Sequence, residues 1–190
     1  MATRLGDTSI ASAQPLVVLG TVDARRSVDA AVSALPLEEV VVRPAVIGDM
    51  KAVEPLVRTF ANENLMLPKA YDQLARNFRE FVVATAPAGQ VIGCGALRIY
   101  SESLAEICSL AVARPMQGSG VGRLVVQRLL DEARGLNVAT VFALTLRPEF
   151  FERNGFSRVP REMFPLKVWA DCRNCPKLHA CDEIAVAIDI

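Results

Sequence analysis

The stretch Leu104–Ala133, LAEICSLAVARPMQGSGVGRLVVQRLLDEA, decides how the chain folds. Its first nine residues, Leu104–Val112, are strand-like, and an amphipathic helix begins directly after the loop Gln117–Gly122. The glycines of this loop let the backbone turn tightly and approach a ligand without interference from Cβ atoms. Backbone amides at a helix N-terminus have no intrahelical partner and carry partial positive charge, which suits a phosphate group. A strand, a glycine loop and a helix in this order therefore predict a pyrophosphate site.

The spacing of the glycines distinguishes between the known kinds of phosphate loop. A Walker loop ends in Gly-Lys-Ser or Gly-Lys-Thr, and a dinucleotide fingerprint reads GxGxxG; the sequence GSGVG fits neither. The loop instead resembles the Gln/Arg-x-x-Gly-x-Gly/Ala signature of the GNAT acyltransferases, with Gln117, Gly120 and Gly122 at the matching positions. In that family the loop holds the pyrophosphate of acetyl-CoA. An ordinary glycine-rich turn between strand and helix is the alternative for this loop.

Composition and charge limit the class of protein. A chain of 190 residues with 52% hydrophobic residues predicts one domain with a sizeable core. Because 21 Lys and Arg residues balance 21 Asp and Glu residues, we expect no general attraction to nucleic acid or to an anionic membrane. We also expect no secretory signal and no apolar run of the roughly 18 residues that cross a bilayer. Five cysteines, an odd number, favour reduced thiols in a cytoplasmic protein.

The pattern of apolar residues predicts an α/β (α+β) fold with a mixed, mostly antiparallel sheet flanked by helices. We expect residues 1–39 to form a loosely attached N-terminal extension and residues 40–190 to form the folded domain. The expected strands are Val40–Val42, Phe81–Thr85, Gln90–Tyr100, Leu104–Val112, Thr140–Thr145 and Glu183–Ile190. The expected helices are Met50–Asn62, Lys69–Phe78, the helix after the glycine loop, and Pro148–Arg153. Asp49 is expected to cap the first helix, and Pro55 to delay or kink it.

Further stretches resemble one branch of the GNAT family more closely. LMLPK at Leu65–Lys69, VIGCGAL at Val91–Leu97, EFFERNGF at Glu149–Phe156 and KVWADCRNCPK at Lys167–Lys177 are similar to the acetyltransferase domain of bacterial N-acetylglutamate synthases. We expect the short, stand-alone form, because no amino-acid-kinase domain precedes these stretches. The resemblance implies acetyl transfer from acetyl-CoA to the α-amino group of L-glutamate, which is the entry to arginine biosynthesis.

This reaction needs a base, because only the free amine attacks a thioester. Glu106, in the middle of a strand among apolar residues, is the candidate base, acting through a water molecule; a carboxylate paired with a nearby Arg or Lys is the alternative. The resemblance implies that Thr145 lies near the leaving thiol, and a β-branched strand residue is the alternative there. Phe150 and Phe151 occupy the stretch in which many GNAT enzymes carry an acidic tyrosine, so the general acid stays unassigned.

The resemblance also implies the groups that bind the two substrates. Backbone groups that bind the pantetheine arm and thioester belong to Leu110, Ala111 and Val112. The pyrophosphate is implied to contact Gln117, Gly118, Ser119, Gly120, Val121, Gly122 and Arg123. The residues that fall in stretches resembling acceptor-binding segments are Leu67, Lys69, Arg98 and Lys167. Cations there would suit the two carboxylates of glutamate, although a solvated surface charge is the commoner fate of a lysine. Cys108 stands where relatives often carry Arg, which keeps another acceptor amino acid open.

Three functional questions remain open at this point. Cys172, Cys175, His179 and Cys181 have the side chains of a zinc site, but a second CxxC is missing, so we expect reduced thiols and no required metal. Alternatives to the glutamate reaction are another small amine, a protein N-terminus, or a non-catalytic acetyl-CoA sensor. The exposed edge of the final strand could serve a homodimer.

Overall fold

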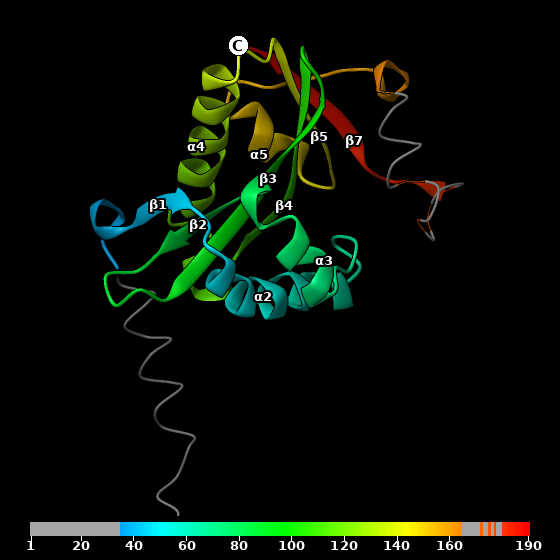
Figure 1. Cartoon of the computed structure of the whole chain (residues 1–190). Coiled ribbons are helices and arrows are strands. Elements are labelled where there is room, and N and C mark those ends of the chain that lie inside the picture. The colour runs from blue at the N-terminus through cyan, green and yellow to red at the C-terminus, as the bar shows by residue number, and fades with distance from the viewer. Residues whose placement is uncertain (1–34, 165–171, 173–174, 176, 178–179) are drawn as a thin grey trace, which may run out of the picture.

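The computed structural model describes residues 35–164, 172, 175, 177 and 180–190. Its middle layer is one mixed sheet of seven strands in the order β1-β2-β3-β4-β5-β7-β6 (Figure 1). The strands are β1 Val41–Pro44, β2 Phe81–Thr85, β3 Val91–Ser101, β4 Leu104–Val112, β5 Thr140–Thr145, β6 Ser157–Arg158 and β7 Ile184–Asp189. Every neighbouring pair is antiparallel except β4 and β5, which are parallel. The expected mixed, mostly antiparallel sheet is therefore confirmed.

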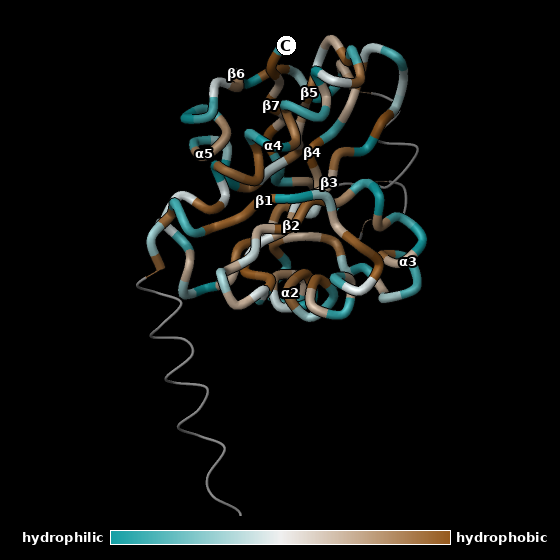
Figure 2. Tube along the Cα trace, turned by 60° about the vertical axis from the view of Figure 1, so that its left-hand side comes forward, coloured by the Kyte–Doolittle hydropathy of each residue, from teal (hydrophilic) through white to brown (hydrophobic). Residues whose placement is uncertain are grey.

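Helices cover both faces of the sheet, as the sequence predicted. The helices are α2 Met50–Asn62, α3 Tyr71–Arg76, α4 Val121–Gly135 and α5 Pro148–Glu152. Helices α2 and α3 pack on one face, and α4 and α5 pack on the other (Figure 1). The tube coloured by hydropathy shows hydrophobic segments gathered between the helices and the sheet (Figure 2). Short 3₁₀ helices occupy Leu37–Glu39, Ile47–Asp49, Phe78–Glu80, Arg114–Met116 and Arg161–Met163. No helix in the described part of the chain is long and apolar enough to cross a membrane.

The alternation of side chains along the strands produces two cores. On β2, Val82 and Ala84 point toward α4, whereas Val83 points toward α2. On β3, Gly95 lets α4 lie close, because a Cβ at Gly95 would be 2.9 Å from Cγ1 of Val125. A glycine inside a strand often marks a bulge or a close contact, and Gly95 has both, because the register with β4 also shifts between Cys94 and Ala96.

Four elements have the predicted bounds, namely α2, β2, β4 and β5. The second helix is shorter than expected and covers Tyr71–Arg76, because Ala70 before it is extended and Asn77 ends it. β1 begins and ends later than expected, and the two-residue β6 was missed because it is too short to form a pattern. The described end of the expected extension, around Leu35 and Leu37, packs against the core.

The expected roles of two residues around α2 were wrong. Asp49 precedes the helix but makes no hydrogen bond to its first turn. Its carboxylate accepts a hydrogen bond from the Val46 amide at 2.8 Å and pairs with Arg43 at 2.7 Å, since a 3₁₀ turn precedes α2. The helix starts at Met50 as predicted and runs unbroken through Pro55. Pro55 is exposed, so the carbonyl that loses its partner one turn earlier can bond to water.

Two local irregularities open the sheet beside β4. Opposite β3, one extra residue of β4 bulges at Ser109–Leu110, and Ser109 has a φ of 52°. On its other side, β4 pairs with β5 only over Leu104–Glu106, although both strands continue. Beyond Glu106 the backbone of β4 therefore has no strand beside it on the β5 side.

Candidate active site

A cavity of about 1440 Å³ lies where β4 and β5 part. Its walls come from the loop after α2, the second half of β4, the glycine loop with the start of α4, the end of β5 with α5, and the C-terminal segment before β7. Pockets for one small ligand measure about 300–1,000 Å³. This cavity has room for a long ligand together with a second, smaller one.

The glycine loop forms one end of the cavity. Gly118 and Gly120 have φ values of +83° and +103°, a conformation that other residues rarely adopt. Gly120 directly precedes α4, and no side chain caps the first turn of that helix. The amides of that turn have no intrahelical acceptor, so a ligand anion can accept their hydrogen bonds. Gln117 holds the loop to the sheet, because its Nε2 donates to the Val112 carbonyl at 3.2 Å.

Glu106 lies at the point where the two strands part. Its side chain lines the cavity but is only 2% exposed. Tyr100 donates a hydrogen bond from its hydroxyl to Oε2 of Glu106 at 2.9 Å. Across the sheet, Glu106 is in register with Arg98 on β3 and with Phe142 on β5. A buried carboxylate at the wall of a cavity is well placed to accept a proton from a bound ligand.

Thr145 lines the cavity at the end of β5. Its Oγ1 accepts a hydrogen bond from the Arg147 amide at 2.9 Å. A hydroxyl has one proton to donate in addition to its lone pairs. Because the bond from Arg147 occupies a lone pair, the proton of Thr145 stays available to a ligand in the cavity.

The charged side chains of the cavity are not balanced among themselves. The cations that line it are Lys69, Arg114, Arg123, Arg147, Arg153, Arg161 and Lys177. Arg114 pairs with Glu63, and Lys177 pairs with Asp182 at 3.0 Å. The hydrogen bond from Lys177 lowers the pKa of Asp182. Among the described residues, the other five cations have no ion-pair partner. Unpaired cations around a cavity favour a ligand with several negative charges.

The structure brings most of the predicted site residues together at this cavity. Those that line it are Leu67, Lys69, Glu106, Leu110, Ala111, Val112, Gln117, Gly118, Gly120, Gly122, Arg123 and Thr145. Ser119 and Val121 do not: the Ser119 hydroxyl donates to the Met116 carbonyl at 2.7 Å, and the Val121 side chain is buried in the core. Their backbone amides still belong to the loop and to the first turn of α4.

The other predicted residues have different positions. Arg98 does not line the cavity, and its Nε lies 3.7 Å from Oε2 of Glu80. Lys167 and His179 lie outside the described residues. Of the described residues, no group of three or more His, Cys, Asp or Glu side chains could hold a metal ion.

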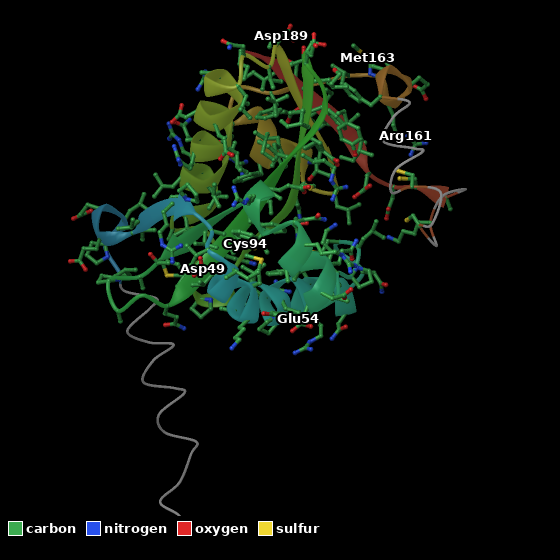
Figure 3. All side chains as sticks on the ribbon, viewed as in Figure 1. Asp49, Glu54, Cys94, Arg161, Met163 and Asp189 are labelled. Atoms are coloured by element: carbon green, nitrogen blue, oxygen red, sulfur yellow. The ribbon has the colours of Figure 1, made fainter. Side chains whose placement is uncertain are left out.

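Sequence reasoning missed several residues of the site. Arg147, Arg153 and Arg161 line the cavity, and Tyr100 bonds to Glu106 from β3. Arg161 lies beside the C-terminal segment, whereas Cys94 lies between the sheet and α2 (Figure 3). The position of Arg147 could have been found from the sequence, because it follows directly after the end of β5. The other three depend on tertiary packing.

Comparison with known proteins assigns the chain to a family. Residues 51–156 match the model of the acetyltransferase (GNAT) family. The chain is 41% identical over 152 residues to an uncharacterised N-acetyltransferase of Chlorobaculum tepidum, covering 80% of this chain and 97% of that protein. It is 42% identical over 121 residues to an amino-acid acetyltransferase of Mycobacterium tuberculosis, covering 63% of this chain and 69% of the relative.

A solved structure of similar fold contains coenzyme A together with an acetylated amino acid. The N-acetylglutamate synthase of Neisseria gonorrhoeae, complexed with coenzyme A and N-acetylglutamate, matches with a TM-score of 0.71 and 26% identity. The match covers 79% of this chain and 35% of that longer chain.

Proposed function

The chain belongs to the GNAT family of acetyltransferases, and from this premise we propose that it transfers the acetyl group of acetyl-CoA to the α-amino group of L-glutamate. It is an N-acetyltransferase with acetyl-CoA as cosubstrate. The acceptor is the part that we propose. The product would be N-acetylglutamate, made in the cytoplasm as the first step of arginine biosynthesis.

The observation that carries the proposal is the combination of one buried carboxylate with unpaired cations around a single cavity. Glu106 is 2% exposed at the cavity wall, and Lys69 and Arg161 line the same cavity without an ion-pair partner in the described part of the chain. Acetylation of an amino acid requires both features, because the ammonium group must lose a proton and the carboxylates must be bound.

Acetyl-CoA would occupy the end of the cavity that the glycine loop forms. The amides of the loop and of the first turn of α4 would bind the pyrophosphate, and Arg123 would add positive charge. The pantetheine arm would run along the free edge of β4, where the backbone of Leu110, Ala111 and Val112 would hydrogen-bond to it and polarise the thioester carbonyl.

Glutamate would occupy the other end, beside the loop after α2. Leu67 and Lys69 reach the cavity from that loop, and Arg161 reaches it from the segment after β6. Two separate cations suit an acceptor with two carboxylates. Lys167 remains a prediction from the resemblance. Arg98 does not line the cavity, so its position favours an indirect role behind Glu106.

The reaction that follows has two proton losses from nitrogen and one displacement. Glu106 accepts the first proton from the ammonium group, through a water molecule, and the lone pair of the amine forms a bond to the thioester carbon while the carbonyl π electrons move to oxygen. The tetrahedral intermediate then re-forms the carbonyl as its carbon–sulfur bond breaks, and the CoA thiolate leaves. We propose that the hydroxyl of Thr145 gives its proton to the leaving sulfur and takes the second proton from nitrogen, so that it ends unchanged. N-acetylglutamate and CoA are the products.

The test is thiol release from acetyl-CoA against a panel of amino acids that includes glutamate, glutamine and aspartate. We expect release with glutamate, reduced by roughly a hundredfold or more in Glu106→Gln. Glu102→Gln is the matched control, because Glu102 is exposed in the turn between β3 and β4 and its loss should leave the rate unchanged. Coenzyme A binding without release for any amino acid would overturn the proposal and favour a protein N-terminus as acceptor, or a sensor.

A second acceptor is favoured by one observation. Cys108, which is neutral, lines the cavity two residues after Glu106. A neutral side chain at this position suits an acceptor with one carboxylate fewer, such as glutamine. Faster release with glutamine than with glutamate in the same panel would establish this alternative.

A further inference from the structure

We propose that Tyr100 is a positioning residue that holds the carboxylate of Glu106 in the geometry needed for proton transfer. This inference rests on the proposed function, because it assigns a partner to the proposed base. The Tyr100 hydroxyl donates to Oε2 of Glu106 at 2.9 Å. Glu106 lines the cavity and Tyr100 does not. The phenol therefore binds the carboxylate from within the protein, while the carboxylate faces the substrates.

The ring of Tyr100 is itself held by packing. Its centroid lies 5.8 Å from that of Phe142, and Phe142 stacks on Phe164 with centroids 4.0 Å apart. Phe142 is also the residue of β5 that is in register with Glu106. The Tyr100 side chain has only two torsions, and packing against Phe142 of β5 restricts them. The hydroxyl is thus fixed relative to the carboxylate.

A fixed hydroxyl donor sets the orientation of the base. With Oε2 bonded to Tyr100 at 2.9 Å, rotation of the carboxylate about its last side-chain torsion is restricted, so its direction toward the cavity is fixed. After Glu106 has taken up a proton, Oε2 can still accept the hydrogen bond, so one contact serves the base before and after the transfer.

Other charged groups face Glu106 and are unchanged by a substitution at Tyr100. Arg98 of β3 is in register with Glu106, and Glu80 lies beside Arg98. Cys108 lies two residues along β4, on the same side of the strand. From β5 the residue in register is the uncharged Phe142. An effect of Tyr100 on kcat would therefore be separate from the charge of these groups.

The variant that tests this is Tyr100→Phe, which keeps the ring and removes the hydroxyl. Tyr71→Phe is the matched control, because Tyr71 is the only other tyrosine and is 43% exposed at the start of α3. We expect kcat of Tyr100→Phe to fall by about tenfold, with unchanged KM values for acetyl-CoA and for glutamate, because only the proton transfer is impaired. A merely structural role would lower the amount of folded enzyme and leave kcat per folded molecule unchanged.

Two further measurements make the outcome decisive. In the Glu106→Gln background, Tyr100→Phe should have no additional effect on the residual rate, because the two residues act as one unit. In urea unfolding, the two single variants and the double variant should show a coupling that is absent for Tyr71→Phe. An unchanged kcat together with zero coupling would overturn the positioning role alone. Failure of the wild type to turn over any amine would instead overturn the proposed function.

Discussion

Replacing Gly122 with alanine should weaken the binding of coenzyme A while leaving the fold intact. Gly122 is the second residue of α4 and lines the cavity. It does not have a positive φ, so alanine fits its backbone. A Cβ at this position would lie 3.3 Å from Cε2 and Cζ of the Phe150 ring and 3.6 Å from Cγ2 of Val112. The new methyl group would thus fill space between α4, β4 and α5.

Two opposing effects on stability follow from these distances. Alanine in a helix is favoured over glycine by up to about 1 kcal/mol. The 3.3 Å contact requires the partly buried Phe150 ring to move by a few tenths of an ångström, which costs about 1 kcal/mol. We therefore expect the free energy of unfolding to change by less than about 1 kcal/mol.

The effect on the ligand should be measurable but limited, because the signature of the loop also accepts alanine at the position of Gly122. If the shift of the helix start weakens one hydrogen bond between a phosphate oxygen and the amides of the first turn, the loss is about 1 kcal/mol. This corresponds to a rise in Kd of roughly fivefold. Isothermal titration with coenzyme A measures the Kd, and urea unfolding measures the stability.

Gly135→Ala is the matched control. It changes the last residue of the same helix, where a Cβ would meet nothing within 4 Å. This variant should bind coenzyme A as tightly as the wild type. A Gly122→Ala variant that is folded and binds coenzyme A within twofold of the Gly135→Ala variant would refute the placement of the pyrophosphate at this turn.

Two predictions concern the rest of the molecule. Arg43 lowers the pKa of Asp49, so the stability that this pair contributes is present at neutral pH and is lost as the pH falls below about 4. Asp49→Asn should thus lower the free energy of unfolding by about 1–2 kcal/mol at pH 7 and by much less at pH 3; an equal loss at both would contradict this. Burial raises the pKa of the Cys94 thiol to about 12, so a disulfide reagent at pH 8 should modify up to four of the five cysteines and reach the fifth only in guanidinium. Native modification of all five, or one modification fewer in Cys94→Ala than in the wild type, would show that Cys94 is accessible.

Much of the fold could be predicted from the sequence because its signals are local. The bounds of α2 follow from apolar residues at helical spacing, and those of β5 from a short apolar run that begins after Asn137. The predicted ends of helices and strands that were wrong are those where the pattern of apolar residues is weak. Lys69 and Ala70 are helix-forming residues that lie outside the helix, since Ala70 is extended and the Lys69 side chain lines the cavity.

The site also contains features that the sequence predicts and features that it does not. The glycine loop was predictable, since Gly118 and Gly120 must adopt positive φ values and act through the backbone. The pairing of Tyr100 with Glu106 was not, because it depends on the register between β3 and β4 and on the bulge that interrupts it. Which of the 21 Lys and Arg residues face the cavity is likewise decided by tertiary packing and not by spacing along the chain.

The short parallel contact between β4 and β5 also divides the sheet into two parts. One unit, β1 to β4, is built from consecutive antiparallel neighbours, and the other combines β5, β6 and β7 from the second half of the chain. The ladder between them covers only Leu104–Glu106 with Thr140–Phe142. A cofactor lying in the gap would replace the missing ladder, so its arrival should slow amide hydrogen exchange in β5 and β7 more than in β2. Ligand binding would then complete the sheet as well as fill the site.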